Sequence, residues 1–473
     1  MKEYDVAVVG AGPAGLFAAV ELLKLGVRGE RVAIFEKGLK VEARKCPLVA
    51  KQQGSQEGRA EQKCYNCSPC HILHGVGGAG AFSSGIVNLR PDIGGDLDKM
   101  LGSWEEAEEV IKYVDSLLVE FGAPESTLIT PNPEEVKSLE KLAARAGAKY
   151  IPAPQRVLGT ENVIKIVSNI TSYLESNGVK LYELTEVARI QRDQGGFFKL
   201  ETSKGVFYAK KVLLAPGRSG AHWFRRIAEE LGIEIESAPL DIGVRVEVPY
   251  YVTEHVTQVS FDPKIVLYTK SYDDMVRTFC TNPQGYVLKE QYEDGTVGVN
   301  GATFTTRKSK NTNFALLVTL KLTVPYQDVL ELGKSIARIA TKVGMGKPII
   351  QRLGDLEKGR RSTWDRISRS IITPTLRDVT PGDISLVLPH RVVENLVEAI
   401  ERLDTVYPGL HSPQTLIYAP EIKYYSVKAV VSRDFETSIP GIYAAGDGAG
   451  LSRGLNIAAA TGILAARGIA KTL

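Results

Sequence analysis

Near the N-terminus, the stretch DVAVVGAGPAGLFAAVELLKLG (residues 5–26) begins with a short apolar run and continues, after a group of glycines, with apolar positions at helical spacing. A second strand-like run, RVAIFEK, follows at residues 31–37. Short continuous apolar runs are typical of strands buried on both faces of a parallel sheet and connected by a helix. The pattern therefore predicts a strand, a helix and a second strand in a βαβ unit.

Residues 179–217 show a different pattern, in which apolar and polar positions alternate. The alternation is interrupted by DQGG at 193–196 and SKG at 203–205, and the last apolar run ends in APG at 215–217. A period of two residues between glycine-containing turns predicts short antiparallel strands. We expect a β-meander whose last strand is buried.

The turn after the first strand contains three glycines in a Gly10-x-Gly12-x-x-Gly15 pattern. Gly10 allows a tight turn, Gly12 lets the backbone approach a pyrophosphate, and Gly15 lets the helix pack closely on the strand. Glu36 ends the second strand, where a carboxylate accepts hydrogen bonds from ribose hydroxyls. The motif predicts a dinucleotide site with contacts from Gly10, Gly12, Pro13, Ala14, Gly15, Glu36 and Lys37.

The C-terminal segment returns to the same type of ligand. The apolar run GIYAA at 441–445 ends at Gly446-Asp447, and a glycine-rich loop and a helix of small residues follow. This segment resembles the second FAD motif of flavoproteins with a glutathione-reductase-like fold. The resemblance implies that Asp447 contacts the ribityl and pyrophosphate region and that the helix start faces the flavin. It implies backbone contacts from Gly446, Gly454, Leu455 and Asn456.

The meander likewise resembles the one found in FAD proteins. That resemblance implies that the Val187 backbone contacts adenine and that Ala215 and Gly217 lie close to the cofactor. No second strand–GxGxxG–helix unit occurs in the sequence, so a dedicated NAD(P)H domain is not indicated.

These segments predict an α/β fold in which a Rossmann-like FAD-binding domain is built from both chain ends. We expect its first part at residues 1–220, including a cysteine-rich segment at 46–70, and its second part at 431–473. Residues 221–430 would then form an inserted α+β substrate or cap domain. The sequence of this segment contains alternating apolar and polar positions typical of strands.

Composition adds few constraints. The 473 residues are 44% hydrophobic and 24% charged, which is ordinary for a globular protein, and the net charge of +3 indicates no nucleic-acid partner. No apolar stretch reaches the roughly 18 residues that a membrane span needs. We expect no secretory signal, and therefore a cytoplasmic protein with reduced, metal-bound or catalytic cysteines.

Four of the five cysteines are Cys46, Cys64, Cys67 and Cys70, and the last three form a C-x-x-C-x-x-C run. Such a run with a remote fourth cysteine beside proline is typical of a [4Fe–4S] cluster. A zinc site that uses His71 or His74, redox-active dithiol chemistry and purely structural thiols remain alternatives. The fifth cysteine, Cys280, is expected to be a buried small residue.

A glycine-rich run follows the cysteines directly and leads into AFSSG. Glycines at this density let the backbone approach a ligand closely. We expect Gly77, Gly78, Ser83 and Ser84 to lie against the flavin or its phosphates, so that the segment connects a cluster to a flavin edge.

Four stretches together resemble a known family: CYNCSPCHILHGVGGAGAFSSG, APGRSGAHWFRRIAEELGI, PLDIGVRVEVP and GDGAGLSRG. They look like the uncharacterised FAD-dependent dehydrogenases of archaea and bacteria, and the resemblance covers nearly the whole chain. The family usually has SDGK where this chain has SSGI at residues 83–86. Any role of that aspartate and lysine therefore cannot be transferred.

The leading interpretation is an FAD-dependent oxidoreductase acting on a small organic substrate. The cluster would pass electrons to or from a carrier such as ferredoxin. The alternatives are thiol or disulfide chemistry at Cys64 and Cys67, a non-enzymatic flavin redox sensor, and an RNA-modifying flavoprotein.

Charged residues near the predicted turns are candidate substrate contacts, and each also has a structural or surface interpretation. The candidate catalytic residues are Arg218, His222, Arg245 and Glu247, with Arg360 and Arg361 added for an anionic substrate.

Overall fold

The computed structural model describes residues 2–46, 67–83, 85–237, 240–292, 294–304, 307–320, 329–423 and 427–473. The chain forms two compact units. The first unit combines Met1–Leu128, Arg156–Ala238 and Tyr425–Leu473, and the second combines Ile129–Gln155 and Pro239–Tyr424. The predicted fold class, a Rossmann-like domain built from both chain ends with an inserted α+β domain, is confirmed.

The first unit is organised around one sheet. Parallel strands lie in the order β7, β2, β1, β10, and β10 continues into the antiparallel meander β9, β8. The C-terminal half of β10 pairs in parallel with β22, so the end of the chain completes the sheet. The strands are β1 (Glu3–Val9), β2 (Val32–Phe35), β7 (Lys180–Tyr182), β8 (Val187–Arg192), β9 (Phe198–Thr202), β10 (Gly205–Leu214) and β22 (Ile442–Ala444).

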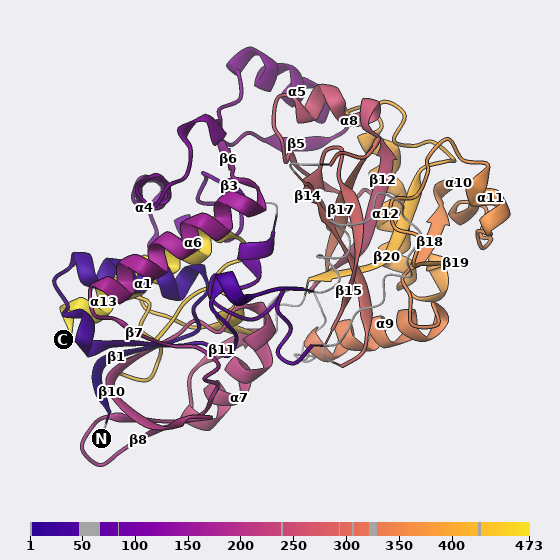
Figure 1. Ribbon diagram of the computed structural model, residues 1–473. Coiled ribbons are helices and arrows are strands. Elements are labelled where there is room, and N and C mark those ends of the chain that lie inside the picture. Colours follow the sequence, from indigo (N-terminus) through magenta and orange to yellow (C-terminus); the bar gives the residue numbers. More distant parts are fainter. Residues whose placement is uncertain are drawn as a thin grey trace. The chain divides into compact units, whose positions relative to one another are not determined.

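The main helices of this unit pack against one another across the ends of the sequence (Figure 1). Gly462 lies so close to the Ala14 carbonyl that a Cβ could not fit, which brings α1 and α13 into backbone contact. The buried carboxylate of Glu21 accepts hydrogen bonds from Arg467 at 2.7 Å and from Tyr113 at 2.7 Å. The helices are α1 (Pro13–Lys24), α4 (Trp104–Glu120), α6 (Gly159–Ser176) and α13 (Leu455–Lys471).

The second unit contains an eight-stranded sheet in the order β19, β18, β20, β12, β17, β14, β13, β5. All neighbours are antiparallel except β18 and β19. Its strands are β5 (Ala148–Ile151), β12 (Leu240–Pro249), β13 (Lys264–Tyr268), β14 (Met275–Asn282), β17 (Asn311–Leu320), β18 (Ile349–Arg352), β19 (Thr380–Pro381) and β20 (Leu416–Lys423).

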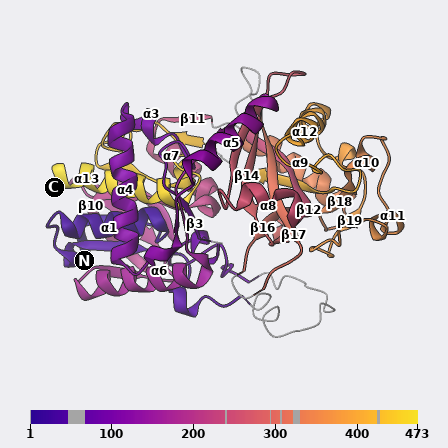
Figure 2. The same cartoon turned by 90° about the horizontal axis from the view of Figure 1, so that it is seen from above.

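Strand β12 shows how the two faces of this sheet differ. Ile242, Val244 and Val246 belong to an apolar core, whereas the alternating Arg245 and Glu247 belong to a polar face, and all of them are buried. Several helices that are labelled in Figure 2 contribute apolar side chains to that core. They are α5 (Pro133–Arg145), α8 (Tyr250–Thr257), α9 (Val329–Val343) and α12 (His390–Leu403), and a separate hairpin is formed by β15 (Tyr286–Gln291) and β16 (Val297–Ala302).

The shorter elements complete the description. They are α3 (Leu97–Leu101), α7 (Ala221–Leu231), α10 (Leu353–Leu356), α11 (Trp364–Ser368), β3 (Ile86–Asn88), β4 (Leu128–Ile129), β6 (Gln155–Val157), β11 (Ile235–Ser237) and β21 (Val427–Ala429). In the described ranges, no helix has the length and apolarity needed to cross a membrane.

The limits of the two units differ from the expected domain boundaries at 220/221 and 430/431. Phe224 and Ile227 of α7 pack into the core of the first unit, and β11 pairs with β21 there. Residues 129–155 join the second unit because β5 pairs with β13 at the edge of its sheet. Such long-range pairings have no local sequence signal.

We predict a pH-dependent contribution to stability from Asp5. Hydrogen bonds from Arg31, with a further ion pair to Lys210, lower the pKa of Asp5 from 3.8 to about 2. Because the folded-state pKa is lower than the unfolded one, this stabilisation is present above pH 3.8 and is lost as the pH falls toward 2. We expect Asp5→Asn to lower the free energy of unfolding by about 1–2 kcal/mol at neutral pH. The urea concentration at the unfolding midpoint should then decrease less steeply between pH 4 and pH 2 than it does for the unchanged protein.

Candidate functional site

The turn between β1 and α1 has the backbone geometry that the glycine motif predicts. Gly10 has φ +105°, and a Cβ there would overlap the Ala215 carbonyl at the end of β10. By contrast, the one described atom that a Cβ on Gly12 would meet is the Gly78 Cα, at 4.0 Å. In the described part of the chain no side chain caps α1. The amide N–H groups of its first turn therefore remain available to donate to a ligand.

The loop that leads from β22 into α13 lies beside this turn. Gly446 has φ +79°, and a Cβ there would lie 3.1 Å from the Ala14 Cβ. Helix α13 begins after Gly454, and among the described residues no side chain caps it. Two helix starts from opposite ends of the sequence therefore present their amides in the same unit.

The glycine run after the cysteines connects these two helix starts. Gly77 donates its amide to the Ala11 carbonyl at 2.8 Å. Gly78, with φ +61°, approaches Gly12, and Gly80 packs so closely on Leu455 that a Cβ would not fit. The predicted residues Gly77 and Gly78 thus lie against the first turn of α1.

Glu36 has more partners than the sequence indicates. Its buried carboxylate accepts amide hydrogen bonds from Ala11 at 2.9 Å, Gly38 at 2.8 Å and Gly75 at 3.0 Å. A carboxylate has about four lone-pair positions, so about one remains for a ligand hydroxyl. Glu36 therefore organises the loop around the predicted site in addition to its expected role.

Arg44 is a residue that sequence reasoning missed. Its guanidinium donates to the carbonyls of His71 at 2.9 Å, Ile72 at 2.8 Å and Val76 at 2.7 Å, and it stacks 4.6 Å from the Phe82 ring centroid. Burial lowers the pKa of Arg44 to about 10. No local motif distinguishes this arginine, because its partners lie about 30 positions away in the sequence.

The structure describes three of the four cysteines that the sequence predicts to bind a metal or cluster. Cys64 lies outside the described residues, and Cys46, Cys67 and Cys70 are free and partly exposed. Within the described ranges, no three His, Cys, Asp or Glu side chains come together as they would around a metal ion. The [4Fe–4S] and zinc assignments therefore stay predictions.

Asp447 and Arg218, predicted separately, form an ion pair. The Arg218 Nε donates to Asp447 Oδ2 at 2.9 Å, and the other carboxylate oxygen accepts from Ser452. Asn456 is buried and donates its amide group to the carbonyls of Asn88, Arg90 and Ile93. That side chain therefore fixes the loop beside α13, whereas the prediction concerned its backbone.

The remaining predicted residues of the first unit have local roles. The Val187 carbonyl accepts a hydrogen bond from Trp223 at 2.6 Å, and Lys37 pairs with Glu186 at the surface. The Ser83 hydroxyl donates to the Gly80 carbonyl at 2.7 Å. Ser84 lies outside the described residues. Gly217 has φ +67° and its carbonyl contacts Gly448, whereas His222 is exposed on α7.

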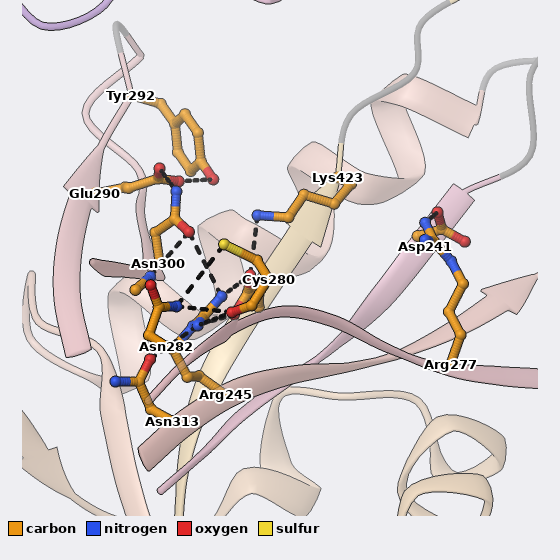
Figure 3. A network of polar contacts seen from close by, with 12 residues as sticks. Asp241, Arg245, Arg277, Cys280, Asn282, Glu290, Tyr292, Asn300, Asn313 and Lys423 are labelled. Carbon is orange, nitrogen blue, oxygen red and sulfur yellow. Dashed lines mark hydrogen bonds and ion pairs between the residues drawn. The ribbon is translucent and has the colours of Figure 1, made fainter. Parts of the chain in front are cut away.

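Arg245 lies at the centre of a buried polar network in the second unit (Figure 3). Its Nε and Nη2 donate to both oxygens of Glu421, at 2.8 and 2.7 Å, and its Nη1 donates to Asn313 and to the Cys280 carbonyl. A fifth, long contact reaches Asn300 at 3.5 Å. All five donors of the guanidinium are directed at protein acceptors, which leaves none for a substrate.

The hydrogen-bonding capacity of the Glu247 carboxylate is also used by protein donors. Its buried carboxylate accepts hydrogen bonds from Tyr418 at 2.5 Å, from Thr375 and from Asn311. Burial raises the pKa of Glu247. Arg360 pairs with Asp355 at 2.8 Å, and Arg361 is exposed.

The first unit is a Rossmann-like domain in which, among the described residues, no side chain caps the starts of α1 and α13. A family model described as "FAD-dependent protein, C-terminal domain-like" matches residues 239–423, nearly the whole long segment of the second unit. A model described as "Glucose inhibited division protein A" matches residues 375–473. Each covers less than half of the chain.

Whole-chain comparisons give more distant similarity. An "Uncharacterized protein" of Clostridium beijerinckii (strain ATCC 51743 / NCIMB 8052) is 24% identical over 98% of this chain and 80% of its own length. Glycine oxidase from Geobacillus kaustophilus is 16% identical, with a TM-score of 0.39 over 100% of this chain and 95% of that one. L-proline dehydrogenase from P. horikoshii is 14% identical, with a TM-score of 0.40 over 98% and 91%.

We predict that Arg44→Met destabilises the loop at residues 71–78. The buried Val76 carbonyl and the partly buried carbonyls of His71 and Ile72 would lose a charged donor, and we expect a loss of about 3 kcal/mol in the free energy of unfolding. Limited proteolysis should show earlier cleavage near this loop. Arg28→Met, at an exposed arginine of the same unit, is the matched control. Equal stability of the two variants would contradict the assigned role.

Proposed function

We propose that this protein is an FAD-dependent oxidoreductase acting on a small organic molecule. The observation that carries the proposal is the glycine run at residues 77–80, which contacts the starts of both α1 and α13, two helices that no side chain of the described residues caps. Backbone amides at helix starts favour phosphate groups. The description of the family model over residues 239–423 names FAD-dependent proteins and supports the same cofactor.

The residues present fit this cofactor. In the proposed site, the open face of Gly12 and the amides of Ala14 and Gly15 bind the pyrophosphate. Glu36 offers its remaining lone pair to a ribose hydroxyl. Asp447, held by Arg218, offers an acceptor beside the start of α13. Bound FAD supplies an acceptor for electron pairs or single electrons.

Two finer assignments rest on the sequence alone. A [4Fe–4S] cluster on Cys46, Cys64, Cys67 and Cys70, with ferredoxin as electron carrier, is supported by the cysteine spacing. FAD-dependent thiol chemistry at Cys64 and Cys67 is the alternative. NAD(P)H is not part of the proposal, because the sequence lacks a second nucleotide motif.

We predict that Gly12→Ala abolishes flavin binding without unfolding the protein. Among the described residues the new methyl group would meet Gly78 alone, at 4.0 Å, so we expect the fold to tolerate it, but it would occupy the space proposed for the pyrophosphate. The measurement is flavin content per chain by absorbance, with the thermal unfolding midpoint on the same samples. Gly195→Ala, whose Cβ has ordinary contacts and lies outside the site, is the control. Full flavin content in Gly12→Ala would refute the proposed site.

A separate prediction concerns the metal. Anaerobically purified protein should contain about four irons and four sulfides per chain, in addition to flavin, if the cysteines hold a cluster. Flavin without iron after anaerobic reconstitution would leave the flavoenzyme proposal intact and reject the cluster. Protein without any flavin would reject the main proposal.

A further inference from the structure

A cavity of about 40 Å³ lies in the first unit among the helices α1, α4, α6 and α13, all labelled in Figure 1. Each helix contributes at least two of the lining side chains, such as Leu16 of α1, Val114 of α4, Ile166 of α6 and Ala459 of α13. Protein interiors are packed so densely that voids larger than a water molecule are few. The cavity is therefore a feature to be explained and not an ordinary property of a helix layer.

The chemistry of the lining restricts what the cavity can hold. Each residue that lines it is apolar or a glycine. A buried water molecule needs about two to four polar partners, whereas apolar cavities stay dry and take apolar guests such as benzene or xenon. The fitting ligand is therefore an uncharged molecule that needs no hydrogen bonds.

The volume restricts the size of that ligand. A water molecule needs roughly 10–15 Å³ of such space, and an engineered cavity that takes benzene measures about 150 Å³. With about 40 Å³, the cavity in this protein has room for a guest of about two or three heavy atoms. A ring or a longer chain is too large for it.

The position of the cavity connects it with the proposed cofactor site. Pro13 and Leu455 are only partly buried, whereas the other lining residues are buried. These two are the first residues of α1 and α13, and the glycine run at residues 77–80 contacts both of them. Gly77 of that run also lines the cavity. The least buried side of the cavity therefore lies at the two helix starts that are proposed to bind FAD.

We propose that this cavity binds dioxygen and that dioxygen is an electron acceptor of the oxidoreductase. Dioxygen is apolar, fits the volume and is a known reaction partner of flavins. It would accept two electrons and two protons and leave as hydrogen peroxide, while the reduced cofactor returns to its oxidised form. The binding of the gas follows from the cavity alone, whereas its role as acceptor rests on the proposed function.

Xenon is the probe for the cavity itself, because it is apolar, fits the volume and is detected by xenon NMR spectroscopy without a cofactor. We expect the purified full-length protein to shift the xenon resonance in proportion to its concentration. Val114→Leu and Val163→Leu each lengthen a lining side chain by one methylene group, and each should remove most of this shift.

Val110→Leu is the matched control. Val110 is also buried on α4, one turn before Val114, but it does not belong to the lining. This variant should shift the xenon resonance as the unchanged protein does. Thermal unfolding midpoints show whether a variant acts through misfolding, and the two lining positions on different helices provide independent variants.

The role of dioxygen is tested on the flavin-containing protein. The cofactor is reduced by light in the absence of oxygen, and the protein is then mixed with aerated buffer in a stopped-flow spectrophotometer. We expect Val114→Leu and Val163→Leu to slow reoxidation severalfold at unchanged flavin content, and Val110→Leu to leave the rate unchanged. One hydrogen peroxide should form per flavin.

The proposal is wrong if the xenon shift is the same in the unchanged protein and in both lining variants. It is equally wrong if these variants lose the xenon shift but are reoxidised at the unchanged rate, or if no hydrogen peroxide forms. The xenon measurement does not depend on flavin. A protein that loses its xenon shift in the lining variants but contains no flavin would therefore reject the proposed function and the acceptor role, and keep the gas site.

Discussion

The geometry of the candidate site depends on two buried charged residues, Glu36 and Arg44, which together fix the conformation of the loop at residues 71–78. Glu36 accepts the amides of Ala11, Gly38 and Gly75, and Arg44 donates to carbonyls between His71 and Val76. A glycine-rich loop has few side chains of its own with which to pack, and its polar backbone would otherwise need water. The Glu36 carboxylate accepts hydrogen bonds from backbone amides of the loop, and the Arg44 guanidinium donates hydrogen bonds to its carbonyls. The loop can therefore lie against the first turn of α1 in one conformation.

The same principle operates differently in the second unit. There the buried charges are distributed over the polar face of a sheet whose other face is an ordinary apolar core. Arg245 is saturated by protein acceptors and Glu247 by protein donors, so both maintain the sheet.

Local sequence information was sufficient for the elements that have local causes. The turn at Gly10 and Gly12 and the meander from β8 to β10 follow from glycine spacing and hydrophobic period, whereas the return of the chain at β22 was expected from a resemblance to flavoproteins. The role of Arg44, the transfer of residues 129–155 to the second unit and the saturation of Arg245 depend on contacts between distant positions. A single sequence contains no signal for such contacts, because any exposed arginine has the same local appearance.

The pairing of β22 with β10 has a consequence for synthesis on the ribosome. Residues 212–214 of β10 have no partner on that side until residues 442–444 have been made. All of the second unit precedes residue 425, so its chain is complete while the first sheet still has an open edge. Open edges are sites of aggregation for nascent chains. A released chain that ends between residues 425 and 442 would therefore contain the whole sequence of the second unit but leave one edge of the first sheet open, which makes it a substrate for chaperones.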